Sequence, residues 1–147
     1  MAIESANYFF IPGRATEDDL IGVLGLQGAE RMQRACTWAI RGHNYWIDLM
    51  IQPGPQVSIR VALTNPSAVF EHLRQLLDDL WNHVPGSLIG PHEQVSFTSW
   101  GEEEWKTLAA DYRARRDQFR RHFGEIEAAV SADAVWSVLD SNGHDHR

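Results

Sequence analysis

Residues 45–63 read YWIDLMIQPGPQVSIRVAL, a pattern that predicts two β-strands joined by a tight turn. Proline cannot donate to a β-ladder and glycine tolerates positive φ, so Pro53-Gly54-Pro55 marks the turn. A hairpin symmetric about Gly54 places Ile51 opposite Val57 and pairs apolar residues with apolar residues along its length. A slip by one residue would mix the apolar and polar sets, so the pattern also predicts the register.

A second turn, at His43-Asn44, adds an earlier strand to this hairpin. A two-residue loop there sets Ile40 against Ile47 and Trp38 against Leu49. Both hairpins then agree about which face of the sheet is apolar, and agreement between independent turns strengthens each. The predicted core face consists of Cys36, Trp38, Ile40, Tyr45, Ile47, Leu49, Ile51, Val57, Ile59, Val61 and Leu63.

The opposite face of the predicted sheet mixes apolar, polar and charged residues. It carries Thr37, Ala39, Arg41, Trp46, Asp48, Met50, Ser58, Arg60, Ala62 and Thr64. In the simplest interpretation it faces solvent, with Asp48 and Arg60 as a cross-strand ion pair. Alternatively another helix covers it, or it binds a partner, because Trp, Met and Arg are enriched at interfaces. The partner hypothesis assigns Trp46, Asp48, Met50 and Arg60 to the binding surface.

Helical signals follow the hairpins. Asn65-Pro66 is a typical helix start, and an apolar stripe continues that helix to about His83. Ser99 with Glu102 predicts a capping box and a long helix to about Val130. Ser131 then begins a short last helix.

The remaining segments give weaker signals. Residues 7–11 predict a short strand or an extended lead, and residues 29–32 a short helical turn. Thr16 with Asp19 predicts a capping box and a helix between those segments. Residues 87–93 are expected to form a loop, and residues 94–98 a fourth strand.

Together these elements predict an α+β fold. An antiparallel meander of three to four strands packs one face against two or three amphipathic helices. Residues 1–140 are expected to form a single globular domain, and residues 141–147 a flexible C-terminal tail.

The composition of the chain argues against several classes of protein. Apolar residues make up 44% of the 147 residues and six are Trp, which argues against disorder. A net charge of −7 disfavours nucleic-acid binding, which needs clustered Lys and Arg. The N-terminus lacks the basic region of a signal peptide, and no apolar run approaches the length of a membrane span. We therefore expect a cytoplasmic protein that binds neither nucleic acid nor membrane. The single cysteine, Cys36, is expected to be a buried apolar residue.

Catalytic and metal-binding patterns are missing from the sequence. There is no G-x-S-x-G elbow, and the serines lie at expected strands or helix caps. His72, Asp79 and His83 would share a helix side but spread over about 16 Å, too far for one ion. The sequence therefore predicts no catalytic residue, no metal and no cofactor.

Residues 113–122 form the one basic stretch, with five Arg and one Asp. It is expected to be a solvated helix face paired with nearby acids. The alternative is a site for an anion or an acidic partner, formed by Arg113, Arg116 and Arg120, or the contact surface of a regulatory or assembly subunit.

By elimination, the leading hypothesis is a non-enzymatic protein-binding module that masks or escorts a partner. Bacterial toxin-neutralising immunity proteins and acidic secretion chaperones are small proteins of this class. The partner would be a basic toxin or secreted effector, steered by exposed acids such as Asp78 and Asp79. The protein itself would be a monomer or homodimer.

The competing hypothesis is a small-ligand-binding domain or an enzyme. Its pocket would lie between sheet and helices, and would be lined by Trp38, Tyr45, Tyr112, Arg116 and His122.

Overall fold

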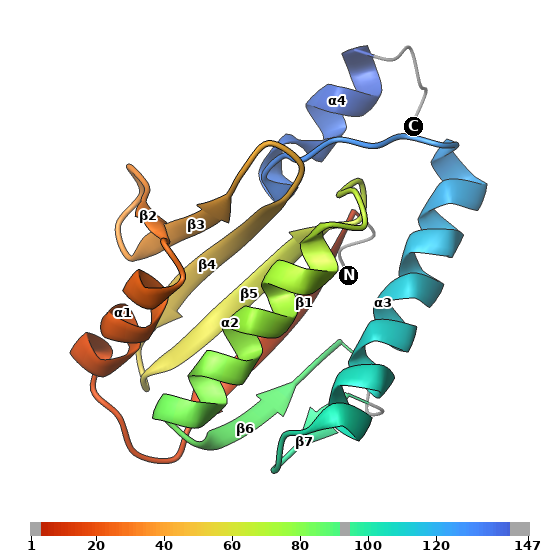
Figure 1. The fold of residues 1–147 in the computed structure, drawn as a ribbon. Helices are drawn as coiled ribbons and strands as arrows, with labels where there is room; N and C mark the ends of the chain where they lie inside the picture. Colours follow the sequence, from red (N-terminus) through yellow and green to blue (C-terminus); the bar gives the residue numbers. More distant parts are fainter. Residues whose placement is uncertain (1–3, 92–94, 142–147) are drawn as a thin grey trace.

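Strands and helices are interspersed along the chain in the computed structural model, which describes residues 4–91 and 95–141 (Figure 1). The strands are β1 (Ser5–Pro12), β2 (Glu30–Arg31), β3 (Thr37–Arg41), β4 (Trp46–Gln52), β5 (Gln56–Ala62), β6 (Gly86–Ile89) and β7 (Ser96–Phe97). The helices are α1 (Glu17–Leu26), α2 (Val69–His83), α3 (Glu102–Phe123) and α4 (Val135–Ser141), with a short 3-10 helix η1 (Ala132–Ala134) before α4. The α+β class is therefore confirmed.

Within the described residues, seven strands form one antiparallel sheet in the order β2-β3-β4-β5-β1-β6-β7. The prediction of three to four strands is wrong. Residues 7–11, predicted as a short strand or an extended lead, belong to strand β1, which lies inside the sheet between β5 and β6. Its other neighbour, β6, comes from the stretch predicted as a loop. The 29–32 segment supplies edge strand β2 rather than a helical turn.

The predicted register of the two hairpins is confirmed. Ile51 lies opposite Val57 across the first turn. Trp38 lies opposite Leu49, and the Gly42 amide donates to the Tyr45 carbonyl (3.0 Å) across His43-Asn44. Apolar alternation thus fixed the pairing of β3, β4 and β5.

Cys36 departs from the expected core face. It is exposed, lies in the turn before β3 and has a positive φ of 60°. The Arg34 carbonyl accepts hydrogen bonds from both the amide and the hydroxyl of Thr37. The Cys36 carbonyl still accepts from the Ile51 amide (3.0 Å), so the backbone keeps the predicted pairing with β4, whereas the side chain leaves the core face.

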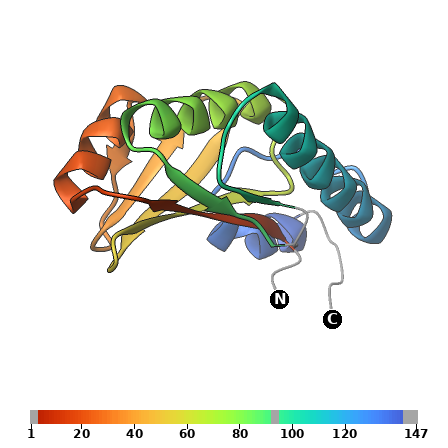
Figure 2. The ribbon, with the colours of Figure 1, turned by 90° about the horizontal axis from the view of Figure 1, so that it is seen from below.

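The sheet separates two layers of helix. Helices α1 and α2 and the first turns of α3 lie on one side, and η1 and α4 lie on the other (Figure 2). The described part of the chain thus has four α-helices, so the prediction of two or three on a single face is wrong. Side chains that are at most 2% exposed line the helix-covered face of the sheet, namely Tyr8, Phe10, Ile47, Leu49, Val57 and Ile59.

Helix boundaries follow the predicted signals in part. The Thr16 capping box of α1 is confirmed, with the Asp19 amide donating to Thr16 Oγ1 (3.2 Å). In contrast, α3 has no side-chain cap: Gly101 holds the N-cap position, so the Ser99 prediction is wrong. This helix ends at Gly124, whose φ of 89° favours glycine, and not at Val130. Ser131 caps η1 as expected.

Asn65 is not the N-cap of α2, which begins at Val69. The side chain is fully buried; its Oδ1 accepts from the Trp46 amide (2.8 Å) and its Nδ2 donates to the Ala62 carbonyl (2.9 Å). The residue therefore joins the start of β4 to the end of β5.

We expect Asn65→Ala to lower the free energy of unfolding by about 2 kcal/mol. The substitution leaves the Trp46 amide without its acceptor, whereas the Ala62 carbonyl keeps the Tyr112 hydroxyl as a donor. Urea unfolding measures the loss, with Asn44→Ala in the exposed turn as the control. Equal stabilities of the two variants would contradict this role.

Candidate functional site

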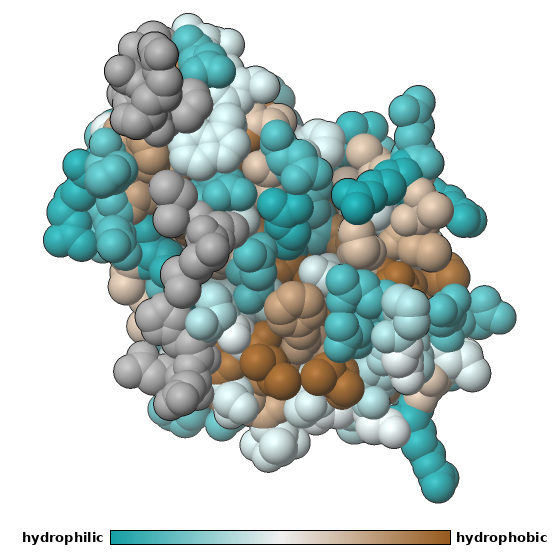
Figure 3. All heavy atoms as spheres, turned by 180° about the vertical axis from the view of Figure 1, so that it is seen from behind, coloured by the Kyte–Doolittle hydropathy of each residue, from teal (hydrophilic) through white to brown (hydrophobic). Residues whose placement is uncertain are grey.

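Among the described residues, η1 and α4 cover part of the sheet face opposite α1 and α2, here called the second face (Figure 2). One row of facing residues crosses it from β6 to β3: Ile89, Phe9, Ser58, Met50 and Thr37. Ile89 is 43% exposed, and Phe9 and Met50 are half-buried. Figure 3 views this face and shows apolar side chains gathered in its lower half among polar ones. The second face therefore offers apolar surface to a partner.

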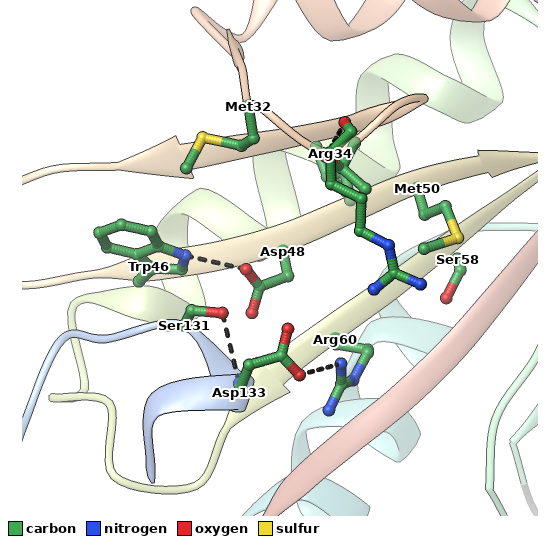
Figure 4. A pocket seen from close by; sticks show the side chains of 11 residues that line it. Met32, Arg34, Trp46, Asp48, Met50, Ser58, Arg60, Ser131 and Asp133 are labelled. Carbon is green, nitrogen blue, oxygen red and sulfur yellow. Dashed lines mark hydrogen bonds and ion pairs between the residues drawn. The ribbon is translucent and has the colours of Figure 1, made fainter. Parts of the chain in front are cut away.

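A pocket of about 180 Å³ opens on the second face beside this row (Figure 4). Its lining includes four residues predicted for partner binding: Trp46, Asp48, Met50 and Arg60. Other segments contribute further lining residues: Met32, Arg34 and Thr37 before and at the start of β3, Ser58 of β5, and Ser131 and Asp133 around η1. Periodicity gave no signal for Met32, Arg34 or Asp133, because those residues lie outside the predicted strands.

Asp48 organises one side of the pocket. Its Oδ1 accepts from the Trp46 indole Nε1 (3.0 Å), and its Oδ2 accepts from the Ala132 amide (2.8 Å). The carboxylate thus connects β4 to the first residue of η1. Because the acceptor is charged, both bonds are expected to be stronger than neutral ones.

The expected Asp48–Arg60 ion pair does not form, although the two residues face each other across β4 and β5. Arg60 instead pairs with Asp133 (3.0 Å) and with Glu4 (3.8 Å). The physical reason is η1, which brings a second carboxylate and a backbone amide over the sheet. Arg60 pairs with the Asp133 carboxylate, and Asp48 accepts from the Ala132 amide.

Two hydrogen-bond donors in the pocket have no partner among the described residues. Arg34 forms no ion pair with any residue in 4–91 or 95–141, and its guanidinium points into the pocket (Figure 4). The Ser58 hydroxyl likewise has no hydrogen-bond partner within those ranges, although the residue is only 8% exposed. The pocket therefore presents unused donors beside the apolar surfaces of Met32, Met50 and Trp46.

Asp78 and Asp79 do not form the exposed acidic surface that the sequence predicted. Both are half-buried on α2. Asp78 accepts from the Trp100 indole Nε1 (2.7 Å), and Asp79 accepts from the Gln27 side chain. These hydrogen bonds connect α2 to the end of α1 and to the chain before α3, because helix packing turns that side of α2 inward.

The three α3 arginines predicted for an anion site also lie outside the pocket, and each has a partner. The Arg113 guanidinium lies 4.8 Å from the centre of the Phe70 ring. Arg116 is buried and pairs with Glu127 (3.3 Å), and Arg120 lies within ion-pair distance of the same carboxylate (3.9 Å). Acids that follow the helix thus balance its charge, which supports the interpretation of a paired helix face.

The residues predicted for a pocket between sheet and helices have structural roles. Trp38 and Tyr112 are buried, and the Tyr112 hydroxyl donates to the Ala62 carbonyl (3.0 Å). Tyr45 stacks on His72, and Arg116 pairs as described. None of them lines the second-face pocket, nor does His122.

Within the described residues, no group of three or more His, Cys, Asp or Glu is placed to hold a metal ion. The helices of those residues include none that is both long enough and apolar enough to cross a membrane. The predicted flexible tail falls outside these residues except for Ser141, which ends α4. No protein-family profile, curated protein or solved structure matches this chain.

Proposed function

We propose that this chain is a non-enzymatic protein-binding module that masks or escorts a partner through its second face. The observation that supports it is the gathering of Trp46, Asp48, Met50 and Arg60 around one pocket on a partly open sheet face. Toxin neutralisation and chaperoning of a secreted protein in the cytoplasm are the activities that such a module would serve.

The size of the pocket favours a partner side chain over a whole small ligand. Drug-sized ligands occupy pockets of roughly 300–1,000 Å³, whereas a cavity of about 150 Å³ holds a benzene ring. The pocket measures about 180 Å³, which suits one side chain. Phe9 and Ile89 extend the apolar surface beside it, as expected of a central anchor within a wider interface.

Charge would contribute to association with a basic partner. The chain carries a net charge of −7, and the exposed acids Glu17 and Asp18 of α1 form no ion pair within the described residues. Such acids attract a basic protein at long range and speed its encounter. Asp78 and Asp79 are poorer candidates because both are engaged within the fold.

We expect Met50→Arg to weaken partner binding at least about tenfold, because a charged side chain would replace an apolar one in the lining of the pocket. The tagged chain captures its partner from a lysate of the source organism at low and moderate salt, and mass spectrometry identifies it. Calorimetry with the purified partner then compares dissociation constants of the wild type and the variant.

Gln75→Arg is the matched control, because it adds the same charge at an exposed position of α2. Equal affinity of Met50→Arg and the control would remove the second face from the interface. If no protein is captured at either salt and small carboxylates raise the melting temperature instead, a small-ligand function replaces the proposal.

A further inference from the structure

We propose that the second-face pocket selects a carboxylate attached to an apolar residue, and that Arg34 is the residue that determines this specificity. The group that fits is the C-terminal residue of the partner chain, with an apolar side chain and its own carboxylate. The inference rests on the proposed function and names the chemistry of the anchor that the pocket accepts.

The hydrogen-bonding groups of the pocket favour a ligand that brings acceptors. Both oxygens of Asp48 already accept hydrogen bonds, and Asp133 Oδ1 accepts from Arg60. Within the described residues, the Arg34 guanidinium and the Ser58 hydroxyl are unused donors, while Asp133 Oδ2 is an unused acceptor on a side chain that is 70% exposed. A ligand group that supplies acceptors therefore gains hydrogen bonds from Arg34 and Ser58.

The charged side chains of the lining also favour a carboxylate as the ligand group. Arg60 has two carboxylates, Glu4 and Asp133, within ion-pair distance, and Asp48 lies across the pocket. Arg34 is the remaining cation of the lining and has no carboxylate of its own within the described residues. Its planar guanidinium has the geometry to hold both oxygens of one carboxylate.

The apolar surfaces define the rest of the ligand. Figure 4 shows Met32 and the Trp46 ring toward one end of the pocket, with Met50 beside the Arg34 guanidinium. Methionine side chains are flexible and adapt to irregular apolar groups. When a carboxylate binds Arg34, the side chain of the same residue can contact the apolar lining of the pocket. A C-terminal leucine has such an apolar side chain beside its carboxylate, whereas a glutamate side chain ends in the carboxylate itself.

Three small probes test the inference directly. N-acetyl-L-leucine carries the apolar side chain and the terminal carboxylate, N-acetyl-L-leucinamide lacks the charge, and N-acetyl-L-glutamic acid α-amide carries a side-chain carboxylate. Titrations followed by ¹H–¹⁵N spectra, including the Trp46 indole resonance, give the site and the affinity. We expect N-acetyl-L-leucine to bind about fivefold more tightly than its amide.

Arg34→Met is expected to abolish this fivefold preference while leaving the fold unchanged. Arg121→Met is the matched control, because it removes the same charge from an exposed position on α3 and should preserve the preference. Retention of the preference in Arg34→Met would overturn the role of Arg34.

The other outcomes separate this inference from the proposed function. Equal binding of the acid and the amide, tighter binding of the glutamate probe, or no shift at pocket residues would each overturn the inference. None of these results changes the outcome of the Met50→Arg experiment with the intact partner. The proposed function is therefore tested separately, by the dissociation constants of the wild type and Met50→Arg.

Discussion

Between pH 10 and pH 12 the folded state should lose about 5 kcal/mol of stability through two buried tyrosines, Tyr8 and Tyr112. Both side chains are fully buried. Burial raises the pKa of the Tyr8 hydroxyl well above its ordinary value near 10.0, and the nearby Asp111 carboxylate raises it further. Burial also raises the pKa of the Tyr112 hydroxyl, although Arg116 and Arg120 oppose the shift.

The sign of the effect follows from proton binding. Above about pH 10 the tyrosines of the unfolded chain lose their protons, whereas Tyr8 and Tyr112 keep theirs in the folded state. The unfolded state then binds fewer protons, so the free energy of unfolding falls as the pH rises. Each tyrosine contributes about 1.4 kcal/mol per pH unit, and this stability is fully present below pH 10.

Urea unfolding at a series of pH values, followed by circular dichroism, measures this loss. The double variant Tyr8→Phe/Tyr112→Phe should lose about 5 kcal/mol less than the wild type over the same interval. An identical alkaline loss in both proteins would show that these phenols do not govern it.

The single variants provide an internal control at pH 7. Tyr112→Phe should cost about 1 kcal/mol, because the Tyr112 hydroxyl donates to the Ala62 carbonyl. Tyr8→Phe should cost nothing, because the Tyr8 hydroxyl is buried without a hydrogen-bond partner among the described residues.

Asp48→Ala should reduce the free energy of unfolding by about 3 kcal/mol. The substitution removes the charged acceptor of the Trp46 indole and of the Ala132 amide, and with it one of the links between η1 and the sheet. Denaturant unfolding gives the loss, and amide exchange should be faster at Ala132 than in the wild type. The pocket would lose one of its sides.

Asp133→Ala is the comparison, because it removes a carboxylate of the same pocket whose link between η1 and β5 is a solvent-exposed ion pair. The Asp133 side chain is 70% exposed and pairs with Arg60, so its loss should cost under about 1 kcal/mol. Equal costs at the two positions would mean that Asp48 is an ordinary surface acid.

The sequence was informative where structure depends on near neighbours. The register of β3, β4 and β5 follows from alternation around two turns, and that alternation places Met50 and Trp46 on the face opposite the core. The Thr16 capping box is likewise a relation between residues three apart. Both patterns relate residues that are close in sequence, whose relative positions the backbone geometry already sets. The structure confirms both predictions.

Tertiary packing decided the rest. Strand β1 occupies the inside of the sheet because strands distant in sequence supply both of its neighbours, and local alternation does not specify which strands pair. Asn65, expected as a helix cap, instead bonds the Trp46 amide, 19 residues away, and the Ala62 carbonyl.

The pocket shows the same division between the sequence and the tertiary structure. Its strand residues could be placed on one face from the sequence, whereas Asp48 meets Ala132 across 84 residues of chain. A buried polar group takes whichever partner the packed elements bring within hydrogen-bond distance. Residue types and spacing therefore determined the two faces of the sheet. Only the folded chain decided which charges on the second face are paired, and it leaves Arg34 without an ion-pair partner among the described residues.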